Sequence, residues 1–283
     1  MLFLILSIIC SVTVGIIFKV ARRYTINTVQ IITANYVFAF ALCYLSFKPD
    51  LSTVGADAPW KLYTTIGVLL PVIFLFMAAS IKHMGIVKTD AAQRLSLFIP
   101  IMASWLIFKE EFNYIKIIAL LTAIPALLFI LTKYSQKTKN KWGYPAVVLL
   151  GFGVIDVLFK QIALYTNLPY PTSLFIIFGI AMILMIATAS YEVAFRKMEL
   201  NTRNILFGGL VGIFNFGNIL FYLKAHQEFT KNPSTVFAMM NMGVIITGSL
   251  VGVLIFKEKL TKMNYAGLFM ALVAIVLIVI SQR

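Results

Sequence analysis

Charged residues are scarce in this sequence. Asp, Glu, Lys and Arg together make up 12% of the 283 residues, whereas apolar residues make up 61%. A soluble globular domain carries roughly a quarter charged residues and about half apolar ones. A soluble core of this length cannot bury so much apolar surface. The shortage of charge therefore excludes an ordinary soluble protein and predicts a chain that faces lipid.

Cysteine and histidine are rare as well, with two residues of each. Cys10 and Cys43 lie inside apolar runs without metal-ligand spacing, so they predict neither a disulfide framework nor a metal site. His83 and His226 have no second ligand at metal spacing and are interpreted as loop or interface residues. No Gly-x-Ser-x-Gly, His-Glu-x-x-His or phosphate-binding loop occurs. We therefore predict no enzyme, no metal and no cofactor.

Acidic residues are the scarcest charges, since 10 Asp and Glu stand against 24 Lys and Arg. In a soluble protein such an excess of basic residues would suggest nucleic-acid binding. Here the basic residues stand singly or in short groups between apolar segments, as topology signals do, and they form no basic stripe. We therefore expect a lipid bilayer and a small-molecule substrate as partners, and no nucleic acid.

Long apolar runs, by contrast, are abundant. A helix needs ~20 apolar residues to cross a bilayer core. The sequence holds ten such runs, at residues 2–21, 28–47, 61–83, 86–108, 114–132, 143–162, 170–190, 204–226, 233–256 and 263–281. We predict an all-α integral membrane protein with ten transmembrane helices, the first of which is retained and is not a signal peptide.

Two short motifs occur once in each half of the chain and in the same order. Ile-Ile-Phe-Lys closes the first run at Lys19, and Val-Leu-Phe-Lys closes the sixth at Lys160. Leu-Ile-Phe-Lys-Glu closes the fourth run at Glu110 and the ninth at Glu258. The matched order indicates an internal repeat.

Each half of the chain then contains five runs. Because five is odd, the second half must enter the membrane from the opposite side to the first. Inverted repeats of this kind recur in secondary transporters, which bind substrate near the midplane between the halves. We predict two inverted five-helix repeats, residues 1–135 and 142–283, around a central polar cavity.

The Phe-Lys-Glu motifs also carry a family resemblance. Each motif, Phe108–Glu110 and Phe256–Glu258, is followed by a polar turn and a strongly apolar helix. In this the chain resembles the drug/metabolite transporter superfamily, in the branch with two EamA-type five-helix repeats. Lys109 and Lys257 depart from the small residue that is usual before the Glu. The resemblance implies export or exchange of small polar solutes without ATP hydrolysis, in a bacterial inner membrane.

The orientation of the chain in the membrane stays open. Basic residues are about twice as frequent on the side opposite to the two termini, which favours outward-facing termini. The family resemblance implies cytoplasmic termini instead.

Arg94 is the most informative charge inside a predicted span. A charge at the bilayer centre costs ~2.5–3.5 kcal/mol on insertion scales and therefore needs a reason. Without Arg94 and the adjacent Gln93, the fourth run would be too short to cross. Asp90 stands four residues earlier, on the same helical face, and is a candidate partner. We predict that Arg94 and Gln93 face a cavity and bind substrate.

Lys19 and Lys160 lie close to the exits of their spans. They are predicted to bind a carboxylate or phosphate of the substrate, and the alternative is that they extend to the membrane surface. Asp156 precedes Lys160 by four residues, so an ion pair between them is a further alternative. Because burial disfavours the charged form of a carboxyl group, Asp156 is also the candidate for proton coupling.

Amide and phenol side chains occur in the predicted spans as well. Asn35 and Tyr36 lie in the second span, Asn215 and Asn218 in the eighth, and Asn241 in the ninth. A buried amide is costly unless it is hydrogen bonded. We predict that these five residues offer hydrogen bonds to the substrate, and bonds between helices are the alternative for each.

These patterns predict a secondary transporter of a small polar metabolite, such as an amino acid or organic anion, that works by alternating access. A passive channel is the alternative, although no filter-like motif occurs, and an intramembrane enzyme is less favoured. The protein is expected to be a monomer or a homodimer, for which Gly208–Gly212 supplies only a weak G-x-x-x-G match. Runs 118–131 and 268–280 hold little polarity and are expected to be peripheral.

Overall fold

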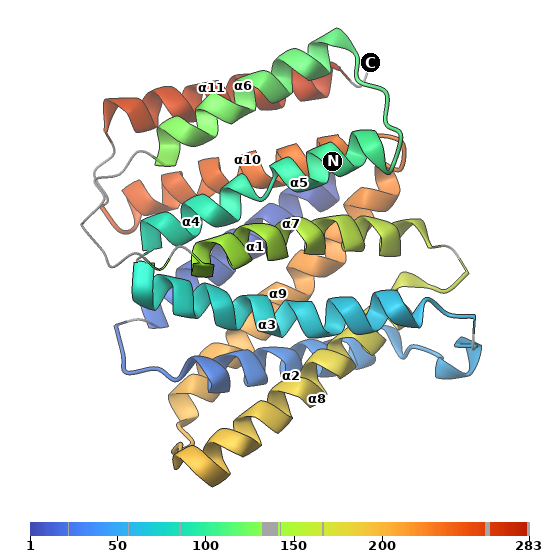
Figure 1. The fold of residues 1–283 in the computed structure, drawn as a ribbon, viewed down its shortest axis with the longest axis vertical. Coiled ribbons are helices and arrows are strands. Elements are labelled where there is room, and N and C mark those ends of the chain that lie inside the picture. Colours follow the sequence, from blue (N-terminus) through green and yellow to red (C-terminus); the bar gives the residue numbers. More distant parts are fainter. Residues whose placement is uncertain are drawn as a thin grey trace.

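The computed structural model describes residues 1–21, 23–55, 57–84, 86–131, 141, 143–165, 167–257 and 261–281. These residues form α-helices and one short 3₁₀ helix, Leu51–Thr53 (Figure 1). The α-helices are α1 (Leu2–Ala21), α2 (Thr28–Phe47), α3 (Trp60–Met84), α4 (Ile86–Leu95), α5 (Phe98–Leu106), α6 (Tyr114–Leu131), α7 (Gly143–Leu164), α8 (Tyr170–Arg196), α9 (Thr202–Glu228), α10 (Pro233–Leu254) and α11 (Lys262–Ile280).

Eight helices within the described residues are long and apolar enough to cross a membrane: α1, α2, α3, α7, α8, α9, α10 and α11. α6 adds a shorter apolar stretch, Tyr114–Ala126. Large apolar side chains project from the outer surface of the bundle, among them Leu45, Ile183 and Phe269, each about two-thirds exposed or more. Such a surface is suited to lipid and not to water.

The fourth predicted span, 86–108, is not a single helix, and this corrects the sequence interpretation. α4 and α5 are separated by a turn at Ser96 and Leu97. Pro100 has no N–H to donate to the carbonyl of Ser96, four residues earlier. Ser96 Oγ donates instead to the carbonyl of Gln93, at 2.6 Å. One missing backbone bond and one competing side-chain bond thus break the helix near its middle.

The long helices run back and forth between two ends of the bundle (Figure 1). We call the end that holds both chain termini end A; Met1, Lys48, Glu110, Glu228 and Ser281 lie there. The opposite end is end B, where Ala21, Met84, Leu131, Arg196 and Leu254 lie.

Two helix pairs form opposite edges of the bundle, α6 with α11 and α2 with α8 (Figure 1). At end A, Asn113 Nδ2 donates to the carbonyl of Ser281 at 2.9 Å, and at the other end of the pair Asn264 Nδ2 donates to the carbonyl of Phe129 at 3.1 Å. These bonds join α6 of the first half to α11 of the second. The edge position agrees with the prediction that the two apolar runs are peripheral.

The two halves repeat the same local turns. Among the described residues, four non-glycine residues have positive φ, and all four are lysines. Lys48 and Lys197 follow α2 and α8, with φ of 43° and 52°, and Lys109 and Lys257 follow α5 and α10, with φ of 50° and 54°. A left-handed residue often ends a helix, although glycine usually takes that place. The positions pair one half with the other.

Glycines allow helices of the two halves to approach each other closely. A Cβ on Gly208 would lie 2.5 Å from the carbonyl oxygen of Ile31, and one on Gly212 would lie 2.6 Å from that of Asn35. The G-x-x-x-G pattern of α9 is therefore used against α2 of the same chain. Gly67 of α3 is packed in the same manner against Ile180 of α8.

Candidate functional site

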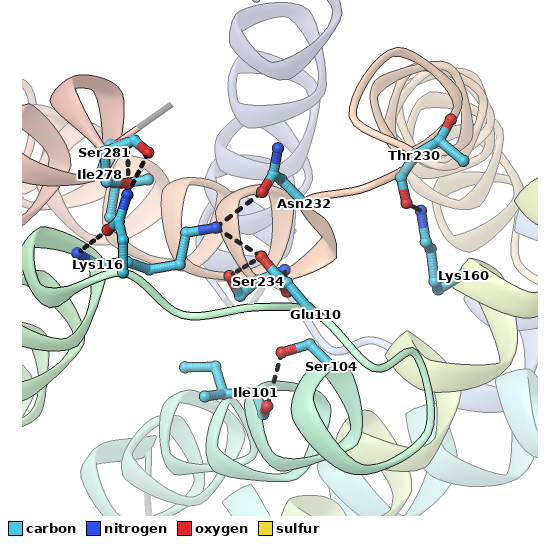
Figure 2. A network of polar contacts seen from close by, with 11 residues as sticks. Ile101, Ser104, Glu110, Lys116, Lys160, Thr230, Asn232, Ser234, Ile278 and Ser281 are labelled. Carbon is cyan, nitrogen blue, oxygen red and sulfur yellow. Dashed lines mark hydrogen bonds and ion pairs between the residues drawn. The ribbon is translucent and has the colours of Figure 1, made fainter. Parts of the chain in front are cut away.

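Glu110 organises a buried polar network at end A (Figure 2). It follows α5, is 4% exposed, and comes after the left-handed turn at Lys109. Glu110 Oε1 accepts from Lys116 Nζ at 2.8 Å and from Ser234 Oγ at 2.7 Å. Glu110 Oε2 accepts from the backbone N–H of Ser234 at 2.9 Å. One carboxylate thus binds a lysine of its own half and a serine of the other.

The place of Ser234 explains why a carboxylate belongs here. Ser234 is the second residue of α10, and the first N–H groups of a helix lack partners and carry partial positive charge. The N-cap residue Asn232 does not cap α10 with its side chain; its Oδ1 accepts from Lys116 Nζ at 2.9 Å. The first half therefore supplies the cap for a helix of the second half.

Lys160 of α7 binds the carboxyl-terminal end of a helix, that of α9. Its side chain is fully buried, and Nζ donates to the carbonyls of His226 and Thr230, both at 3.1 Å. The last carbonyls of a helix carry partial negative charge, which an ammonium group stabilises. In this conformation Lys160 does not extend to the membrane surface. We call Glu110, Lys116, Asn232, Ser234 and Lys160 the end-A closure.

Asp156 lies one turn deeper on α7 than Lys160. Its Oδ1 accepts from Tyr222 OH of α9 at 3.0 Å. Within the described residues Asp156 and Lys160 form no ion pair, because each is bonded to α9 or to the turn after it. The helical spacing of the two residues is as predicted, and the ion-pair alternative does not hold here.

His226, interpreted from the sequence as a loop or interface residue, lies inside the bundle in the last turn of α9. It is fully buried, and its ring packs edge-on against Tyr222 at 4.6 Å and Phe237 at 4.8 Å between centroids. Neither ring nitrogen has a hydrogen-bond partner. Nothing in the local sequence distinguishes this position from an ordinary helix exit.

Four of the predicted amides are hydrogen bonded between or within helices. Asn215 Nδ2 donates to Asn35 Oδ1 at 3.1 Å, which joins α9 to α2. Asn218 Oδ1 accepts from Ser7 Oγ of α1 at 2.8 Å. Asn241 Nδ2 donates to the carbonyl of Phe237 on its own helix at 3.0 Å. The bonds of Asn35, Asn215 and Asn218 match the interhelical alternative, whereas that of Asn241 stays within α10. Substrate contact by these amides stays a proposal.

Tyr36 differs from the amides beside it. It lies fully buried in the main apolar core, and its hydroxyl has no hydrogen-bond partner. A buried hydroxyl without a partner is costly, and substrate contact by Tyr36 stays a proposal.

The other predicted cations lie apart from the end-A closure. Arg94 is half-buried in the last turn of α4, next to the helix break, and Gln93 precedes it. Lys19 Nζ of α1 lies 3.8 Å from the ring centroid of Phe256, which follows α10 at end B. The side chain of Asp90, the predicted partner of Arg94, lies outside the described residues.

Helices that correspond in the two halves pack unequally at the two ends. At end A, α7 packs on α9 and α5 packs on α10. The corresponding pairs toward end B are α1 with α3 and α10 with α4. Among the residues described, each of these pairs packs less closely than its counterpart at end A.

A hollow of about 770 Å³ lies beside the closure, on the outer side of α5 and α6. Its lining includes Trp105, Lys109 and Phe112, and Trp105 is 57% exposed. Its place on the surface distinguishes it from the central polar cavity, which stays a prediction.

Comparison with known proteins gives three findings. The model of the EamA-like transporter family matches residues 1–132 and again residues 141–280. An uncharacterized protein of Haemophilus influenzae is 40% identical over 283 residues, which covers 96% of this chain and 95% of that one. A crystal structure of another protein has a TM-score of 0.75 and 11% identity, and covers 100% of this chain and 97% of that one. The last similarity concerns the fold alone.

Proposed function

The chain belongs to the EamA-like transporter family, and from that premise we propose that it is a secondary transporter of a small polar metabolite. Its family and the eight long apolar helices found in the described residues make it an integral, multi-pass membrane protein. The proposed location is a bacterial inner membrane. The proposed action is export or exchange, by alternating access, of a solute such as an amino acid or organic anion.

The unequal packing of the two ends is the observation that carries this proposal. In two inverted halves, each contact between helices has a counterpart at the opposite end. At end A, α7 packs on α9 and α5 packs on α10. Among the described residues, the counterpart pairs, α1 with α3 and α10 with α4, pack less closely. A chain built this way has two related conformations, and this structure fits the one closed at end A.

Arg94 is proposed as the main substrate residue. It lies at the break between α4 and α5, about halfway along the fourth span, with Gln93 beside it. Interrupted helices recur at the midplane of secondary transporters, where their ends and a nearby charge hold the substrate. A guanidinium there suits a carboxylate or phosphate of the solute.

The other candidates take part in different stages of the cycle. Lys160 binds α9 while end A is closed, so we assign it to substrate only after that end opens. Lys19 is its counterpart at end B. The hydroxyl of Tyr36 and the amides of Asn35, Asn215, Asn218 and Asn241 are proposed to offer hydrogen bonds.

Asp156 is proposed as the proton-coupling carboxylate. It is an acidic residue of the membrane-spanning helix α7, and its oxygen already accepts a bond from Tyr222. Ionisable groups inside membrane spans commonly mark proton or ion pathways.

Transport by the purified protein in proteoliposomes tests the proposal. A panel of labelled amino acids and organic anions is offered for uptake and for counterflow, in wild type and in Arg94→Ala. The wild type should show saturable counterflow for at least one solute. Arg94→Ala should reduce it at least about tenfold, because a charged hydrogen bond to the solute is lost.

Arg196→Ala is the matched control, since the Arg196 side chain is 70% exposed at the end of α8. It should transport as the wild type does. Flux that never saturates and shows no stimulation by solute on the far side would replace the carrier by a passive channel.

A further inference from the structure

The imidazole of His226 is a buried polar group that the closure does not use. Its backbone carbonyl accepts from Lys160, but both ring nitrogens are without partners although the residue is fully buried. Buried side-chain nitrogens are nearly always hydrogen bonded, and an exception calls for a reason. The ring is one donor and one acceptor when neutral and two donors when charged.

The groups around His226 are few and of known charge. From α7, Lys160 binds the His226 carbonyl, and Asp156 binds Tyr222, whose ring contacts the imidazole. α10 offers the ring of Phe237 and has no charged residue between Pro233 and Leu254.

The remaining elements packed on α9 add little charge near the ring. α2 has no charged residue between Thr28 and Phe47, and the amino group of Met1, before α1, pairs with Glu228. On α9 itself, Lys224 Nζ lies against the rings of Phe3 and Tyr170. The ring of His226 thus lies in apolar surroundings with an ammonium group on its own carbonyl.

A positive charge on the ring is therefore costly while end A is closed. An imidazolium needs two acceptors, and neither ring nitrogen has a hydrogen-bond partner. Opening end A would remove Lys160 from the His226 carbonyl and admit water to the ring. Histidine is the side chain that changes charge near neutral pH.

We propose that His226 is a proton-binding residue of the transport cycle, which takes up a proton from end A when the closure opens and stays neutral when it is shut. The ligand is the proton itself: one nitrogen–hydrogen bond forms on the ring as one oxygen–hydrogen bond of a hydronium ion breaks, and water is released. The inference rests on the proposed transport function, because it assumes that end A opens during the cycle. Proton binding then favours the conformation open at end A, as linkage requires.

Histidine labelled with ¹⁵N gives a direct test, because the chain has two histidines. The protein is placed in lipid nanodiscs, and ring signals are followed from about pH 8 to about pH 5. His83, whose ring stacks on Tyr144 at 5.0 Å, serves as the reference, and His83→Gln assigns the two signals.

The comparison is between the wild type and Glu110→Gln, which weakens the closure. His226 should keep the signal of a neutral ring in the wild type and acquire that of an imidazolium in Glu110→Gln. Ser234→Ala provides a milder second opening variant, and Glu111→Gln, next to Glu110 but exposed, should behave as the wild type. Identical His226 titration in closed and opened forms overturns the proposal.

Transport supplies the second readout. For a solute that shows counterflow, His226→Gln should keep counterflow at equal pH, since glutamine offers a donor and an acceptor but binds no proton. It should lose the stimulation that a pH gradient gives the wild type. Stimulation that persists in His226→Gln overturns the inference and leaves the transporter standing. Absence of counterflow for every solute counts against the transporter, and the histidine signals then decide the inference alone.

Discussion

End A and end B are built from corresponding segments of two repeats, yet within the part of the chain that the structure describes corresponding residues make different contacts at the two ends. Lys160 at end A binds one carbonyl in the last turn of α9 and one in the turn after it, whereas Lys19, its counterpart, lies over the ring of Phe256 at end B. α7 meets α9, whereas α1 and α3 pack less closely in the described residues. Corresponding lysines of the two repeats thus have different partners, so a repeated motif does not by itself fix the contacts of its residues.

Substitution of Glu110 is expected to change the stability and the access of end A more than any other substitution considered. Glu110→Gln leaves the ammonium of Lys116 buried without its carboxylate and weakens the cap on α10. Removing one partner of a buried pair costs about 3–5 kcal/mol. We expect a lower thermal midpoint in detergent and an end A that opens. Access is measured as maleimide labelling of a cysteine placed at Ile162, a buried residue near the end of α7, with Cys10 and Cys43 replaced by serine.

Glu111→Gln is the control, because it removes the same charge one residue later from an exposed side chain. It should leave labelling and the thermal midpoint unchanged. Equal labelling of the Ile162 cysteine in Glu110→Gln and in the parent would show that the network is not what holds end A shut.

The glycine contacts between α2 and α9 lie away from the end-A closure and give a second comparison. A Cβ at Gly212 would collide with the backbone of Asn35, whereas one at Gly248 of α10 would meet nothing within 4 Å. Gly212→Ala should lower stability by about 1–3 kcal/mol through overpacking. Gly248→Ala should be neutral or raise it by up to about 1 kcal/mol, because alanine favours helix.

Thermal unfolding of the two variants in detergent measures the difference. Maleimide labelling of the Ile162 cysteine should change in neither variant, because the α2–α9 contact includes no residue of the end-A closure. An opened end A in Gly212→Ala would show instead that this contact belongs to the closure.

Most of the long apolar helices and the two repeats could be predicted because they depend on local composition and on motifs repeated along the chain. The helix break before Pro100 was partly visible, since proline removes a backbone donor, but the competing bond from Ser96 was not. The role of Glu110 could not be found, because its partner Ser234 lies 124 residues away. The Phe-Lys-Glu repeat identified Glu110 as part of a family motif but did not predict that it caps α10. Likewise, the sequence shows His226 at a helix exit but not the burial that leaves its nitrogens without partners.

Substitution of Glu228 is expected to have the smallest effect on stability and on access at end A. Like Glu110, Glu228 joins the two halves there, because its carboxylate accepts from the amino group of Met1 at 2.7 Å. The two groups are 48% and 44% exposed, so water and salt screen the pair and its contribution is about 0–1 kcal/mol. Glu228→Gln should leave the thermal midpoint and the labelling of the Ile162 cysteine within error of the parent, at low and at high salt. If Glu228→Gln lowered the thermal midpoint as much as Glu110→Gln, an exposed ion pair between the halves would hold end A shut as well as a buried one does.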